Sequence, residues 1–111
     1  MLINGLPITP TAADGSTVLA AAATSQKLCS AGKATRGAWI YNPSTAALQG
    51  IAAAESIFVD ITGATAVDSL ASGGTSIEVL PGAMLNVPEG VASQINWIAA
   101  TLHHAITAVV F

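Results

Sequence analysis

The residue types that most often do chemistry are few in this chain. His103 and His104 are its two histidines, and Cys29 is its one cysteine. Adjacent residues on a strand point to opposite faces, so the two histidines cannot readily bind one metal ion together. We therefore expect structural or surface histidines. A metal ring formed around a symmetry axis and a pH-sensitive contact are the alternatives.

Two further groups have a chemical alternative. Cys29 is expected to be a small buried hydrophobe, because a catalytic thiol needs a nearby base and Lys27 alone is weak support. Asp60 and Glu78 are expected on the outward faces of two strands. If those strands are neighbours, the carboxylates could face each other as in a glycosidase, but solvated strand charges are the expected state.

Motifs of the common enzyme classes do not occur in the sequence. It contains no Ser-His-Asp order, no phosphate-cradling glycine loop and no paired-cysteine metal spacing. We therefore expect a protein that is not an enzyme and has no catalytic residue, cofactor or metal.

The scarcity of charge points to a structural role. Charged residues make up 8% of the 111 residues, against roughly 25% in an ordinary soluble domain. A surface so poor in charge is hard to keep apart from its neighbours in water, which favours coverage by other protein in a large assembly.

The sign of the charge excludes two classes of partner. The net charge is −3, and the basic residues are Lys27, Lys33 and Arg36. Nucleic acids and anionic membranes attract proteins with basic stripes, so neither is expected as a partner. Arg36 is expected in a solvated turn, or else paired with a carboxylate across an interface. The sequence also predicts no membrane span and no secretory signal.

Short alternating segments separated by turns indicate an all-β fold. About seven or eight short strands at a spacing of about ten residues predict an antiparallel β-sandwich, jelly-roll-like. The last strand is apolar on both faces, as is typical of a central or interface strand. The alanine-rich residues 45–55 predict a helical turn or a loop. Strands are expected within 17–29, 37–42, 56–62, 76–80, 84–87, 94–100 and 105–111.

The first sixteen residues predict a different structure. Prolines and Asn-Gly and Asp-Gly pairs interrupt them, yet several residues are apolar. We therefore expect an extended N-terminal arm over 1–16, docked on a neighbouring subunit, followed by one sandwich domain over 17–111.

The order of these pieces resembles small virion structural proteins of tailed bacteriophages, of the capsid decoration (cement) or head-fibre type. The likeness covers about residues 24–111, and it differs at residues 45–56 and at the turn 102–104. The segments that carry it are Ser25-Gln26-Lys27-Leu28, Arg36-Gly37-Ala38-Trp39-Ile40-Tyr41-Asn42-Pro43-Ser44, Phe58-Val59-Asp60-Ile61, Ser76-Ile77-Glu78-Val79-Leu80-Pro81-Gly82 and Ile95-Asn96-Trp97-Ile98-Ala99-Ala100-Thr101.

The resemblance implies a structural virion protein on the exterior of a capsid, where it would bridge capsomers and stabilise the shell. Its expected partners are the major capsid protein and copies of itself, in a trimer or dimer. The residues expected at contacts are Leu2, Ile3, Leu6, Ile8, Trp39, Tyr41, Val110 and Phe111.

The alternative is a tail or fibre module that recognises a host glycan. It predicts that Trp39, Tyr41 and Phe58 are exposed near acidic or amide groups, whereas the first hypothesis predicts these aromatics buried.

Overall fold

The protein is built from short strands and one helical turn. A computed structural model describes residues 2–3, 6–7, 12–68 and 74–111. The elements within these ranges are β1 (Leu2–Ile3), β2 (Leu6–Pro7), β3 (Ala13–Asp14), β4 (Thr17–Val18), β5 (Gln26–Cys29), β6 (Ala38–Tyr41), α1 (Ala46–Gln49), β7 (Ile57–Asp60), β8 (Ser76–Val79), β9 (Met84–Val87), β10 (Ile95–Ile98) and β11 (Ala105–Val110).

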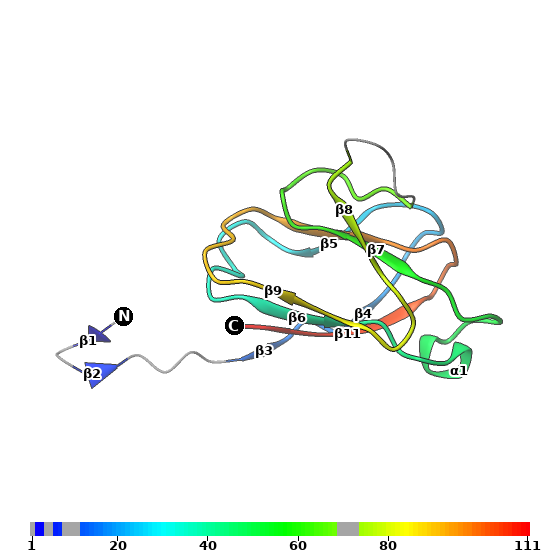
Figure 1. The fold of residues 1–111 in the computed structure, drawn as a ribbon, viewed down its shortest axis with the longest axis horizontal. Helices are drawn as coiled ribbons and strands as arrows, with labels where there is room; N and C mark the ends of the chain where they lie inside the picture. Colours follow the sequence, from blue (N-terminus) through cyan, green and yellow to red (C-terminus); the bar gives the residue numbers. More distant parts are fainter. Residues whose placement is uncertain (1, 4–5, 8–11, 69–73) are drawn as a thin grey trace.

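Two antiparallel sheets pack face to face and confirm the predicted all-β sandwich (Figure 1). One sheet has the order β5-β10-β7-β8. The other has the order β3-β11-β6-β9, with β4 also paired to β11. We call the second one the β6 sheet and the first one the β7 sheet.

The pairing of the strands is that of a jelly roll. β3 and β4 face β11 in one continuous register, with Asp14 opposite Val109 and Thr17 opposite Ile106, and so act as one interrupted edge strand. Three further pairs are β5 with β10, β6 with β9 and β7 with β8. Each pair lies within the preceding pair in sequence order, so that the paired strands together correspond to one long hairpin. The pairs β10–β7 and β11–β6 show how this hairpin is rolled up into two sheets.

The core lies between the two sheets and follows the alternation of the strands. In β6, Ala38 and Ile40 are buried while Trp39 is exposed, as the sequence predicts. β11 lies inside the β6 sheet between β6 and the edge strand, as its apolar character on both faces predicts. The fully buried large apolar side chains are Leu19, Ile40, Ile57, Val59, Ile95 and Trp97.

The alanine-rich segment after β6 forms the helical turn α1. Thr45 caps its start by accepting a hydrogen bond from the Leu48 amide at 3.2 Å, and Gly50 ends it with φ 76°. Figure 1 shows α1 at the end of the sandwich opposite to β1 and β2.

The N-terminal strands stand apart from the sandwich. β1 and β2 pair with each other, with Ile3 opposite Leu6, and Figure 1 shows both beyond the end of the sheets. β3 then pairs with β11, so the last part of the segment 1–16 runs along the edge of the β6 sheet.

Candidate interaction surface

The outer face of the β6 sheet carries a group of aromatic, apolar and neutral polar side chains, among which Trp39 and Met84 are exposed. Residues directly opposite one another on neighbouring strands share a face. The partners of Trp39 and Tyr41 on β11 and β9 have aliphatic, thioether, hydroxyl or amide side chains. We call this surface the aromatic face; it consists of Trp39, Tyr41, Met84, Asn86, Thr107, Val109 and Phe111.

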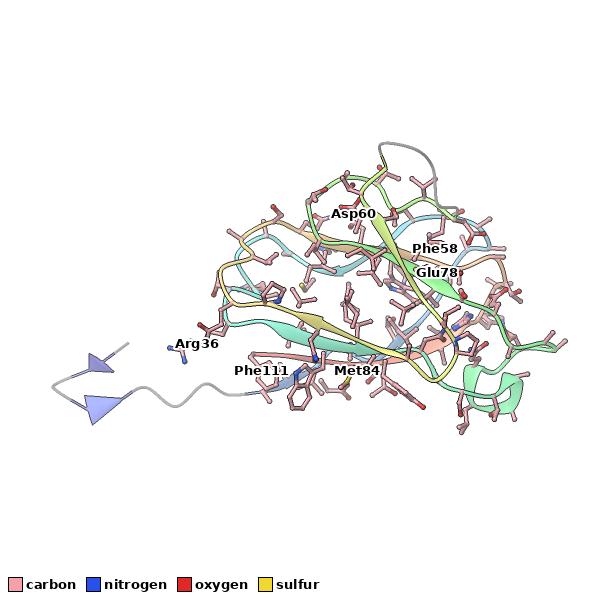
Figure 2. The ribbon with its side chains drawn as sticks, viewed as in Figure 1. Arg36, Phe58, Asp60, Glu78, Met84 and Phe111 are labelled. Carbon is pink, nitrogen blue, oxygen red and sulfur yellow. The ribbon has the colours of Figure 1, made fainter. Side chains whose placement is uncertain are left out.

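Two aromatic rings are locked together on this face. The rings of Trp39 and Phe111 meet edge to face, with centroids 5.1 Å apart and planes at 80°. Figure 2 shows Phe111 and Met84 on the side of the β6 sheet that points away from the β7 sheet. Trp39 remains 49% exposed and Met84 51% exposed, so much of the apolar surface here is in contact with water.

Charge is nearly absent from the aromatic face. Its seven side chains are uncharged, and one charged residue, Asp14, lies opposite Val109 on the edge strand. The Asp14 carboxylate accepts a hydrogen bond from the Ser16 amide at 2.9 Å, which lowers its pKa. The face therefore presents neutral surface with one carboxylate at its border.

The outer face of the β7 sheet differs because a segment of the chain covers part of it. Phe58 and Ile98 lie side by side on neighbouring strands and pack with Ala66, which follows β7. All three are at most 8% exposed. Phe58 is therefore part of a second small core, and it is the one of the three aromatics that is buried. The expectation of burial that belongs to the first hypothesis is not met within the chain by Trp39, which is 49% exposed, or by the half-buried Tyr41.

Asp60 lies on the same outer face and is also buried, so the expectation of a solvated carboxylate is wrong for it. It is 1% exposed and accepts hydrogen bonds from the Thr62 amide at 2.8 Å, the Thr62 hydroxyl at 2.6 Å and the Thr75 hydroxyl. Burial alone would raise the Asp60 pKa, but these hydrogen bonds outweigh it and lower the pKa.

The geometry of Asp60 and Glu78 does not match a pair of carboxylates that face each other. β7 and β8 are neighbours, but Asp60 lies opposite Ser76 and Glu78 lies opposite Phe58. Asp60 is enclosed by hydroxyls, whereas Glu78 is exposed. These positions give the two carboxylates separate structural surroundings (Figure 2).

His104 belongs to a buried polar cluster at the α1 end of the sandwich. It is 0% exposed. Its Nδ1 lies 2.9 Å from Glu55 Oε1 and its Nε2 lies 2.8 Å from Asn42 Oδ1. The Asn42 amide nitrogen donates to two carbonyls, so its oxygen must face the ring.

The other chemistry-bearing residues are not gathered into a site. His103 is exposed and has φ 69°. Cys29 is half-buried in β5, and burial raises the pKa of its thiol. Arg36 lies half-buried before β6. In the described part of the chain, no three His, Cys, Asp or Glu side chains are grouped so that they could hold a metal ion.

The structure places the residues expected at contacts in three different settings. Trp39, Tyr41 and Phe111 come together on the aromatic face. Val110 points to the other side of β11 and packs against the core. Leu2 and Ile3 form β1, and Leu6 lies in β2. Ile8 lies outside the described residues.

Four members of the aromatic face were not predicted from the sequence. Met84, Asn86, Thr107 and Val109 join the aromatic residues because β9 and β11 flank β6. The alternation within residues 84–87 indicated a strand, and so which of its side chains share a face. Its position beside β6 depends on pairing between residues more than forty positions apart in the sequence.

Comparison with protein-family models, with characterised proteins and with solved structures found no match to the chain. None of the helices in the described ranges is long and apolar enough to cross a membrane.

Proposed function

We propose that this chain is a structural virion protein that binds the exterior of a tailed-bacteriophage capsid and stabilises the shell. It acts as a homo-oligomer that bridges neighbouring capsomers. The observation that carries the proposal is the aromatic face, which has no charged side chain, lies on β11, β6 and the edge strand β9, and includes the half-exposed Trp39 and Met84. Covering neutral and apolar surface with protein has a low desolvation cost, because few charged groups lose their hydration.

The binding free energy available from covering this face is sufficient for a protein that binds a capsid in many copies. A tryptophan side chain buries about 150–250 Å², and Trp39 is 49% exposed. Covering the exposed half would contribute about 2–3 kcal/mol per copy. Many copies bound at once add their contributions through avidity.

The jelly-roll fold is compatible with this function by analogy only. Jelly rolls occur in viral capsid proteins and also in lectins, and a fold by itself does not determine function.

The test is the position and number of copies in purified virions that contain the chain. Quantitative mass spectrometry and cryo-electron microscopy should find many copies, on the order of one per capsomer or more, on the outside of the shell. Trp39→Ser should lower this occupancy, whereas Leu80→Ser, at a 57% exposed apolar residue after β8, should not. A few copies at the tail tip would contradict the proposal.

A second candidate function, glycan recognition by a tail or fibre module, has one observation in its favour. Trp39 is exposed and lies beside the amide side chain of Asn86, with Asp14 beyond Val109. Aromatic platforms next to amide and acidic groups suit sugar rings. Titration with host-surface glycans should then change the tryptophan fluorescence of the wild-type protein and leave that of the Trp39→Ser variant unchanged. If glycans change neither protein, this second function is excluded.

A further inference from the structure

An open cleft lies at the edge of the sandwich next to β3. Its volume is about 330 Å³, and it lies where β3 and the end of β11 meet the end of β5. Its apolar lining residues include Leu28, Cys29, Val110 and Phe111, and its charged lining residues are Lys33 and Asp14. This volume is at the lower end of the range of ligand sites and suits a few aliphatic side chains.

The two strands that flank the cleft are both sheet edges. β3 ends the β6 sheet and β5 ends the β7 sheet, so each has a neighbouring strand on one side only within the described ranges. An edge strand presents backbone N–H and C=O groups that can pair with an added strand. A peptide that adds to such an edge places alternate side chains into the adjoining pocket.

The chain contains an apolar segment that fits this description. Residues 1–12 contain leucine, isoleucine, proline and neutral polar residues, and no charged side chain. Within the described part of the chain, β1 and β2 pair with each other and with no strand of the two sheets. They stand beyond the end of the sandwich in Figure 1, and the residues that line the cleft belong to other parts of the chain.

The point where this segment joins the sandwich is also informative. It leads into β3, and Ala13 and Asp14 of β3 line the cleft. In each copy, the segment therefore joins the sandwich at the edge that carries the cleft. The segment of one copy could then meet the cleft of a second copy. Contact between these two different surfaces is heterologous and can be repeated from copy to copy until a ring closes.

We propose that the N-terminal segment Leu2–Pro7 of one copy docks into this cleft of a second copy. There it adds to the free edge of β5 and covers Leu28, Cys29 and Val110. This inference rests on the proposed function in one respect, namely that copies of the chain are each other's partners.

The single cysteine of the chain provides a direct test, since it lines the cleft. Leu6→Cys combined with Cys29→Ser is mixed with wild-type protein under mild oxidation. If the segment of one copy reaches the cleft of another, a disulfide-linked dimer should appear on a non-reducing gel. Leu48→Cys combined with Cys29→Ser is the matched control, because Leu48 is 63% exposed in α1 at the opposite end. It should give little dimer.

A second measurement uses charge in place of a crosslink. Leu6→Asp should weaken self-association in sedimentation velocity by roughly tenfold or more, because burying a carboxylate in an apolar cleft replaces burial of a leucine. Leu48→Asp should leave self-association unchanged. Both variants should keep the wild-type circular dichroism spectrum.

Three results would overturn this inference. They are equal crosslinking of the Leu6 and Leu48 cysteines, a disulfide within one chain when Leu6→Cys is made with Cys29 retained, and self-association that Leu6→Asp does not weaken. The last result would leave the cleft to another occupant. None of these results bears on the copy number in virions, so failure here is distinguishable from failure of the proposed function.

Discussion

Removal of one buried amide, in Asn42→Ala, tests the polar cluster at the α1 end of the sandwich. The Asn42 side chain is 0% exposed. Its nitrogen donates to the carbonyls of Glu55 and Val79, both at 2.9 Å. Its oxygen lies 3.1 Å from Gln49 Nε2 and 2.8 Å from His104 Nε2.

The size of the effect follows from the groups that lose a partner. Gln49 Nε2 keeps two carbonyl acceptors, those of Pro43 and Glu55. The side-chain bonds to the Val79 carbonyl and to His104 Nε2 are lost outright. A buried polar group left unpaired costs about 1–3 kcal/mol, so Asn42→Ala should lower the free energy of unfolding by about 3–5 kcal/mol. Total stabilities are about 5–15 kcal/mol.

Urea denaturation followed by tryptophan fluorescence measures this loss, because Trp97 is buried in the core. Asn86→Ala is the matched control, since Asn86 is an exposed asparagine on β9. It should change the free energy of unfolding by less than about 0.5 kcal/mol. A loss below about 1 kcal/mol for Asn42→Ala, with an unchanged m value, would refute the reasoning.

Three further predictions concern single residues. Asp60→Asn should lower the free energy of unfolding by about 1–3 kcal/mol at pH 7, because the buried carboxylate accepts from Thr62 and Thr75. Since the pKa of Asp60 is lowered in the folded state, this stabilisation is present above about pH 4 and is lost as the pH falls through the folded pKa. Urea titrations should therefore show a smaller difference between the proteins at pH 3 than at pH 7, and an equal difference would contradict the account. His103→Gly should raise the free energy of unfolding by about 0.5–1 kcal/mol, because His103 has φ 69°; a lower Tm would argue against it. Burial raises the Cys29 pKa, so its thiol should react with a disulfide reagent at pH 8 more slowly in the folded protein than in urea, and equal rates would show that the thiol is fully accessible.

The faces of individual strands could be predicted from the sequence because alternation is a local property. Ala38 and Ile40 point inward, Trp39 points outward, and Ile57 and Val59 are buried, as predicted. The jelly-roll order of the strands required the structure, since nested pairs such as β5 with β10 join segments far apart in the chain. The same limit applies to the aromatic face, whose aromatic half was predicted and whose Met84 and Asn86 were not.

The burial of polar residues was also not predicted from the sequence. His104 has its partners Glu55 and Asn42 at sequence separations of 49 and 62 residues, so no local pattern points to them. Asp60 was predicted on the correct face but in the wrong environment. Alternation determines which face of a sheet a side chain lies on. Whether that face is exposed to solvent depends on which other segments of the chain pack over it.

The turn before β11 shows a conflict between a residue type and its backbone. The resemblance to phage virion proteins suggests a glycine-containing turn at this place, where the chain has Leu102, His103 and His104. His103 nevertheless adopts φ 69°, a conformation that glycine favours. The bonds of the next residue, His104, to Glu55 and Asn42 hold the turn in place, so the buried cluster offsets the backbone cost at His103.

The distribution of the acidic residues makes the shortage of surface charge greater than the composition indicates. Six residues are acidic, but Asp60 is buried, and Glu55 uses its carboxylate to accept from Thr101 and to face His104. These two carboxylates hold the fold together and contribute little to solubility. The charges that remain on the surface include Glu78 and Glu89, and Asp14 at the border of the aromatic face, on which no charged side chain lies. A neutral, partly apolar face of this kind is the type of surface that marks interaction sites, which is why the proposed function is placed there.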